Sequence, residues 1–91
     1  MAKEQRIVHF SGDVQGVGFR YTACRVAGGY DVTGYVRNLA DGRVECVVEG
    51  ESDQVEAFLA DLRRNMRDYI HGHTQQTMPH SGQFRHFGVG K

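Results

Sequence analysis

Apolar residues recur along this chain at two spacings, and each spacing predicts one type of secondary structure. Every second position is apolar in short runs such as Val8 and Phe10, or Val44, Cys46 and Val48, which is typical of a strand with one buried face. Apolar residues three or four positions apart predict two amphipathic helices, with stripes formed by Phe19, Ala23, Val26 and Ala27, and by Val55, Phe58, Leu59, Leu62 and Met66. The predicted strands cover residues 5–12, 32–39 and 43–49, and the predicted helices cover 19–29 and 52–66.

Polar residues and glycines mark the boundaries of these elements. Asp41-Gly42 is a strong signal for a hairpin between the second and third strands. Ser52 is the predicted cap of the second helix, which has acidic residues near its start and arginines near its end, as the helix dipole favours. Gly28 and Gly29 weaken the end of the first helix.

The last quarter of the chain has a weaker pattern. Residues 70–78 are compatible with a strand but are polar and include Gly72, residues 79–82 form a turn cluster, and residues 84–89 predict a final edge strand with Phe87 and Val89 facing inward. The predicted order is βαββαβ, with a possible extra short strand. This order predicts an α+β, ferredoxin-like (split βαβ) two-layer sandwich, in which two helices cover one face of an antiparallel sheet.

Composition narrows the class of protein. We expect residues 1–91 to form a single domain. Eleven basic and eleven acidic side chains cancel, so the basic excess typical of a nucleic-acid-binding protein is missing. No run approaches the roughly 18 apolar residues of a membrane span, and the polar start lacks a signal-peptide pattern. These features predict a cytoplasmic protein with no membrane or nucleic-acid partner, and its size and balanced charge suit a monomer.

The segment from Val14 to Arg20 is the clearest candidate for a binding site. Its loop residues are Gln15, Gly16, Val17, Gly18, Phe19 and Arg20, and the first predicted helix begins within it. Glycines let backbone N–H groups crowd toward an anion, and a helix N-terminus adds its positive dipole end. Arg20 supplies a planar, permanently charged donor suited to phosphate oxygens. From these residues alone, the segment is either a phosphate-binding loop or a glycine-rich turn followed by a solvated arginine.

Asn38 ends the second predicted strand, just before the hairpin. In a split βαβ fold this strand can lie beside the strand that leads into the glycine loop, so Asn38 can face the loop. Its amide can hydrogen-bond to a substrate oxygen or hold a water molecule, but it cannot remove a proton. The alternative is a turn asparagine that bonds its own backbone.

Other candidate residues favour structural interpretations. His71 and His73 share a strand face at a spacing that could hold zinc, but with no further ligand nearby we expect a surface strand and no metal site. Cys46 lies in an alternating run and is expected in the core. Cys24 lies within the first helix, and a catalytic thiol there would need a nearby base that the sequence does not identify. Tyr21 is interpreted as a packing residue.

Two segments together closely resemble the two signatures of the acylphosphatase family. They are Val14-Gln15-Gly16-Val17-Gly18-Phe19-Arg20, and Gly34-Tyr35-Val36-Arg37-Asn38 followed by Gly42, Val44 and Gly50. The resemblance covers residues 7–66 and short stretches near the end of the chain. It implies an enzyme that hydrolyses small acyl phosphates to carboxylate and inorganic phosphate by direct attack of a water molecule. It also implies that Arg20 binds the phosphate and that Asn38 positions the water, with neither metal nor cofactor.

The chain departs from the family pattern in places. The glycines at 28 and 29 come early and predict that the first helix stops sooner, and residues 67–78 are more polar than the family usually has there. Two other function classes compete with the enzyme. One is a non-catalytic module of the same fold that binds phosphate or carbamoyl phosphate, and the other is an RNA-binding ferredoxin-like domain. The absence of aromatic residues from the third strand argues against RNA binding.

Overall fold

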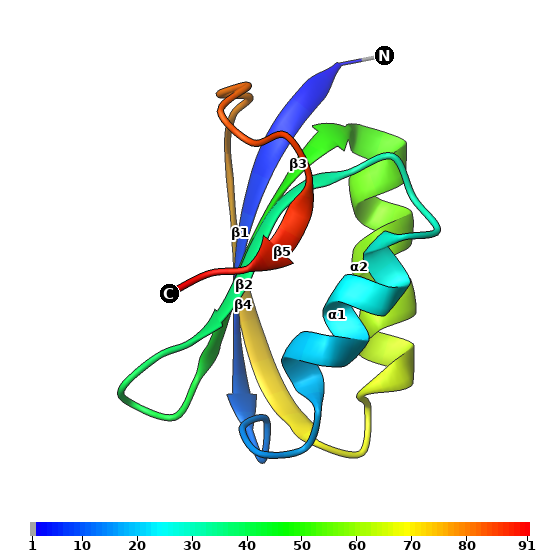
Figure 1. Cartoon of the computed structure of the whole chain (residues 1–91). Coiled ribbons are helices and arrows are strands. Elements are labelled where there is room, and N and C mark those ends of the chain that lie inside the picture. Colours follow the sequence, from blue (N-terminus) through cyan, green and yellow to red (C-terminus); the bar gives the residue numbers. More distant parts are fainter. Residues whose placement is uncertain (1) are drawn as a thin grey trace.

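The computed structural model describes residues 2–91 and arranges them as five strands and two helices (Figure 1). In chain order the elements are β1 (Lys3–Gly12), α1 (Phe19–Ala27), β2 (Thr33–Asn38), β3 (Val44–Glu51), α2 (Ser52–Asn65), β4 (Ile70–Pro79) and β5 (Phe87–Val89). Both helices lie on the same face of the sheet, as the ferredoxin-like prediction requires. At nine and fourteen residues, neither helix in the described part of the chain is long and apolar enough to cross a membrane.

The strands lie in the order β4-β1-β3-β2-β5 within one sheet. The β3 strand is antiparallel to both β1 and β2, and β5 pairs in parallel with β2, so β1, β2 and β5 run in the same direction. The prediction of a purely antiparallel sheet was therefore wrong at this edge, although the fold class is confirmed. The cause is the route of the chain, which leaves β4 at one edge and crosses to the opposite edge before β5 begins (Figure 1).

Alternating residues of the central strands and the stripes of both helices form one core. Its fully buried members include Val8, Phe10, Val36, Val44, Cys46, Val48, Phe58 and Leu62, and Cys46 is thereby confirmed as a core residue. The Phe10 and Phe19 rings lie with their centroids 5.1 Å apart and join β1 to the start of α1. Val89 was predicted to face inward but is 56% exposed, because β5 is short and Val89 lies at its end.

The helix boundaries follow local chemistry, with one correction. The α1 helix ends at Ala27, the last residue of its apolar stripe, and is followed by Gly28, so it stops two residues before the predicted end at residue 29. Ser52 is not the cap of α2 but its first residue, and Glu51 occupies the cap position without a side-chain bond. The Ser52 hydroxyl instead donates to the carbonyl of Ala2, 3.0 Å away, and ties the helix to the start of β1.

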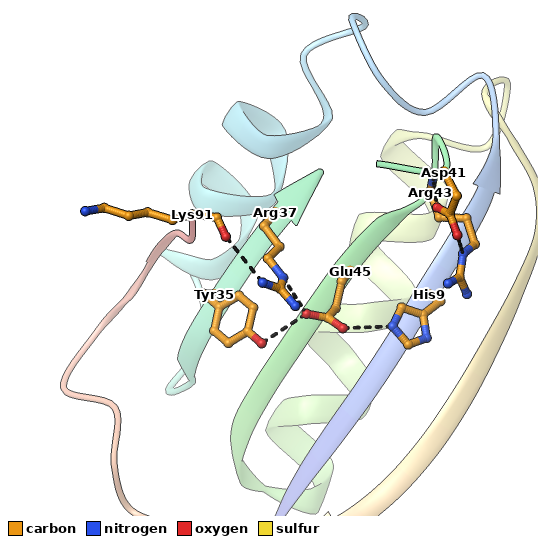
Figure 2. A network of polar contacts seen from close by, with 7 residues as sticks. All are labelled: His9, Tyr35, Arg37, Asp41, Arg43, Glu45 and Lys91. Atoms are coloured by element: carbon orange, nitrogen blue, oxygen red, sulfur yellow. Dashed lines mark hydrogen bonds and ion pairs between the residues drawn. The ribbon is translucent and has the colours of Figure 1, made fainter. Parts of the chain in front are cut away.

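The other face of the sheet carries a polar network centred on Glu45 (Figure 2). His9 from β1 lies 2.9 Å from one Glu45 carboxylate oxygen, while Tyr35 and Arg37 from β2 donate to the other at 3.0 and 2.7 Å. Burial alone would raise the pKa of Glu45, but the hydrogen bonds from His9, Arg37 and Tyr35 outweigh it and lower that pKa. The network therefore links three adjacent strands through one carboxylate.

A second carboxylate, Glu49, anchors the segment that crosses from β4 to β5. Its side chain has no exposed surface, and it accepts hydrogen bonds from the Gln5 side chain, the Ser81 hydroxyl and the backbone N–H groups of Ser81 and Gly82 at 2.6–3.0 Å. Burial would raise the pKa of Glu49, but these donors lower it. Glu49 thus holds the crossing segment against the sheet before β5 begins.

Candidate active site

The candidate site lies at the C-terminal ends of the parallel strands β1, β2 and β5. The α1 helix begins at this end of the sheet, because the loop after β1 leads directly into it (Figure 1). A cavity of about 430 Å³ opens there and is lined by Val14, Gly16, Gly18, Phe19, Arg20, Tyr21, Cys24, Asn38 and Val89. Three segments far apart in sequence therefore build one hollow.

Two glycines shape the loop for reasons of backbone conformation. Gly16 and Gly18 have φ values of 77° and 79°, in the left-handed region that side chains disfavour. A Cβ atom added at either position would meet no atom within 4 Å, so packing against the protein does not explain the glycines. Gly18 is also the cap residue of α1, and its carbonyl accepts the first helical hydrogen bond from the N–H of Thr22 at 2.9 Å. A turn of this kind directly before a helix is suited to binding an anion.

The loop is held in place from both sides. The Asp13 N–H donates to the carbonyl of Tyr69 at 2.9 Å. On the opposite side, the Gln15 side-chain amide donates to the carbonyls of Leu39 and Arg43 at 2.8 and 3.0 Å. Gln15 thus joins the loop to the β2–β3 hairpin, immediately after Asn38.

Arg20 lies in the first turn of α1 and borders the cavity with its side chain exposed. Within residues 2–91, the ion pairs between side chains involve other arginines and histidines but not Arg20. An arginine without an acidic partner keeps its donors available for an anionic ligand.

Asn38 is the last residue of β2 and faces the same cavity. Its carboxamide oxygen is buried and has no hydrogen-bond partner in the described part of the chain. A buried acceptor without a partner costs free energy, about 1–3 kcal/mol when it is fully desolvated. Such a group calls for an explanation, and a water molecule or ligand in the cavity would supply the missing donor.

The structure brings most of the predicted loop residues to the cavity, but not all. Gly16, Gly18, Phe19 and Arg20 line it together with Asn38. Val17 instead packs against the core, and the side chain of Gln15 turns toward the hairpin.

Three residues that border the cavity were not predicted from the sequence. Tyr21 was interpreted as a packing residue, but it is 74% exposed and lines the cavity. Its place directly after Arg20 was the available signal. Cys24 follows one turn later on α1, so helical spacing could have placed it there as well. Val89 had no such signal, because only the pairing of β5 with β2 brings it near the loop.

The side chains that could serve other chemistry are dispersed. No group of three or more histidine, cysteine or acidic side chains suited to a metal occurs among residues 2–91. His71 lies 3.8 Å from Asp13, and His73 packs against Phe10 of the neighbouring strand β1. Burial raises the pKa of the Cys24 thiol, which keeps it protonated and weakens it as a nucleophile.

Comparisons with known proteins agree on one family. Residues 6–89 match the family model described as acylphosphatase. The chain is 44% identical over 80 residues to an acylphosphatase of Methylococcus capsulatus, an alignment that covers 87% of each chain. The crystal structure of acylphosphatase from Bacillus subtilis superposes with a TM-score of 0.86 at 25% identity and covers 97% of this chain and 99% of that one. The fold also matches 12% of the longer HypF of T. kodakarensis, with a TM-score of 0.82 and 34% identity over 97% of this chain. The chain therefore belongs to the acylphosphatase family.

Proposed function

We propose that the catalytic centre of this acylphosphatase-family enzyme binds the phosphate group of a small acyl phosphate between the loop and Arg20, while Asn38 positions the attacking water. The observation that carries the proposal is the pairing, on one cavity, of an arginine without an acidic partner and a buried amide oxygen without a donor. One suits an anion and the other suits a water molecule. The proposed phosphate-binding residues act through their backbone N–H groups, with the guanidinium of the last one in addition, and they are Gln15, Gly16, Val17, Gly18, Phe19 and Arg20.

Phosphoryl transfer needs placement and charge neutralisation more than covalent help. In the proposed mechanism, backbone N–H groups hold the nonbridging phosphate oxygens and Arg20 balances their charge as the transition state forms. The loop is anchored through Asp13 and Gln15, so these donors are arranged before the substrate binds.

The water would donate a hydrogen bond to the Asn38 carboxamide oxygen, which would orient a lone pair of the water toward phosphorus. A bond forms between the water oxygen and phosphorus, and the bond between phosphorus and the bridging acyl oxygen breaks. The acyl group leaves as a carboxylate and needs no general acid. One proton of the attacking water passes to a phosphate oxygen of the substrate and the other stays on the attacking oxygen, so that inorganic phosphate is the other product.

The direct test is phosphate release from acetyl phosphate by the purified chain, with and without EDTA. Because Arg20 and the backbone amides can neutralise the phosphate, we expect turnover that survives chelation. Inorganic phosphate and sulfate should compete with the substrate for the loop. Loss of activity in EDTA, restored by a divalent cation, would contradict the metal-free mechanism. Binding of phosphate without any turnover would identify the chain as a binding module of the same fold.

A further proposal concerns the domain organisation, oligomeric state and location of the protein. We propose that residues 1–91 act as one acylphosphatase-like domain, as a monomer in the cytoplasm and without a nucleic-acid partner. The free thiols of Cys24 and Cys46 suit a reducing compartment. Light scattering during size-exclusion chromatography measures the molar mass in solution. A monomer would show the mass of one chain, and a dimer would show twice that mass.

A further inference from the structure

The cavity beside Arg20 has a second part whose chemistry differs from that of a phosphate site. Tyr21 and Val89 are 74% and 56% exposed, more than the other large hydrophobic residues on the described surface, Tyr69 at 39% and Met78 at 36%. Both of them line this cavity. Exposed apolar side chains that gather beside one site often mark a binding surface, whereas apolar side chains scattered singly over a surface do not.

The apolar surface is built from elements that are held in place. Val89 ends β5, and the N–H of the next residue, Gly90, donates to the carbonyl of Val36 at 2.8 Å. Arg37 then donates to the Lys91 carbonyl at 3.3 Å, as Figure 2 shows, so the chain is held at both residues that follow Val89. Tyr21 stands on the first turn of α1, whose position is set by the core.

Cys24 completes the wall between these two residues. It lies three positions after Tyr21 on α1 and therefore on a neighbouring part of the same helix face. Its thiol is half-buried, burial raises the pKa of this thiol, and a thiol in such surroundings behaves as a small apolar group.

The lining of the cavity carries a single charge. Arg20 is the only charged side chain among its lining residues, and no acidic side chain lines it. An acyl phosphate whose phosphate lies at Arg20 must place its acyl group within a few ångströms, against the neighbouring wall. A second anionic group there would lose hydration without gaining a cationic partner.

We propose that Tyr21, Cys24 and Val89 form a subsite for the acyl group, and that it selects acyl phosphates with an aromatic or branched apolar acyl group over acetyl and over acyl groups that carry a second negative charge. This inference rests on the proposed function, because the phosphate must occupy the Arg20 end. Tyr21 and Val89 act as specificity-determining residues, and the phosphate contacts do not depend on them.

The test compares kcat/KM for benzoyl phosphate, acetyl phosphate and succinyl phosphate in the wild type and in Tyr21→Ala and Val89→Ala. Because the ratio of two substrates is compared between variants, their intrinsic reactivities cancel. For Tyr21→Ala we expect the ratio of benzoyl to acetyl phosphate to fall about tenfold, the scale of a lost apolar contact in a pocket. For Val89→Ala the fall should be about threefold. The inhibition constant of inorganic phosphate should stay within about twofold in both variants.

Two matched variants complete the design. Tyr21→Phe keeps the ring and should keep the wild-type ratio, and Met78→Ala removes an exposed apolar side chain far from the cavity and should do the same. An unchanged ratio in Tyr21→Ala, or a wild type that prefers succinyl phosphate, would overturn the subsite. A wild type that hydrolyses none of the three substrates would instead overturn the proposed function.

Discussion

The two ends of the β2–β3 pair each hold a polar side chain with a buried oxygen, and the two side chains differ in whether their oxygens have hydrogen-bond partners. At one end, Glu49 lies across from Thr33. Its side chain is fully buried, and both of its carboxylate oxygens accept hydrogen bonds. At the other end, Asn38 lies across from Val44, and its buried carboxamide oxygen has no partner. A satisfied buried group stabilises the fold, whereas an unsatisfied one lowers stability and is retained where a ligand supplies the partner. The comparison therefore indicates a structural role for Glu49 and supports the proposed functional role of Asn38.

Arg20→Ala should have the largest effect, because it removes the cationic half of the proposed site. We expect kcat/KM for an acyl phosphate to fall by about 10³ or more, the scale of an arginine that stabilises a transferring phosphoryl group. Phosphate inhibition should weaken together with turnover. Arg20→Lys keeps the charge without the planar donor pair and should recover only part of the loss. Steady-state kinetics and phosphate titration of the folded variants measure both effects.

Asn38→Ala tests the functional end of the comparison. Turnover should fall by a factor on the order of 10², as when one positioned polar group is removed, while phosphate still binds. Stability should not fall by more than about 0.5 kcal/mol, because the amide oxygen has no hydrogen bond to lose. If phosphate binding fails as badly as in Arg20→Ala, then Asn38 holds the loop or the substrate and not the water. A fully active variant would reduce Asn38 to a turn residue.

Glu49→Gln tests the structural end. The new amide cannot accept all the hydrogen bonds that the carboxylate receives, so we expect a loss of about 1–3 kcal/mol in the free energy of unfolding. The kcat should stay close to that of the wild type. Urea denaturation followed by circular dichroism gives the stability. Glu56→Gln serves as the control, because it breaks an ion pair whose carboxylate is 57% exposed and should cost less than about 1 kcal/mol.

Lowering the pH tests the structural role of Glu49 through a smaller change in the free energy of unfolding. The folded-state pKa values of Glu45 and Glu49 lie below their ordinary value of 4.5, so the stability they add is complete above pH 4.5. That stability is lost as the pH falls from 4.5 through the folded-state pKa values. Urea midpoints measured across this range should fall with pH in the wild type and fall less in Glu49→Gln. Equal slopes in both proteins would remove Glu49 from the acid response.

The parts of the fold that were predictable are those with strong local patterns. The alternation of Val44, Cys46 and Val48 and the stripe of α2 each determine a buried face, and both elements were found. The direction and length of β5 could not be predicted, because they depend on where the crossing segment lands, and Glu49 fixes that segment through long-range bonds. Ser52 was misassigned because its hydroxyl finds a partner near the start of the chain, outside the helix.

The candidate site divides in the same way. The glycine loop and Asn38 belong to contiguous motifs, so the sequence predicts their joint role, and that role stays a prediction until the variants are assayed. The side chain of Gln15 bridges to residues 24 and 28 positions away, and no local pattern reveals such a contact. Val89 reaches the cavity only because β5 pairs with β2 at Val36. Contacts set by strand pairing escape any analysis based on periodicity.

The bonds from Gln15 also bear on the time course of the reaction. A loop joined to the hairpin on one side and to Tyr69 on the other keeps its shape without a ligand. Enzymes whose loops close over the substrate include an opening and closing step on the μs–ms timescale, which often limits turnover. An anchored loop beside an open cavity requires no such step. In the proposed mechanism, substrate binding and phosphate release are therefore expected to depend on diffusion and on the strength of the contacts, with no loop closure between binding and chemistry.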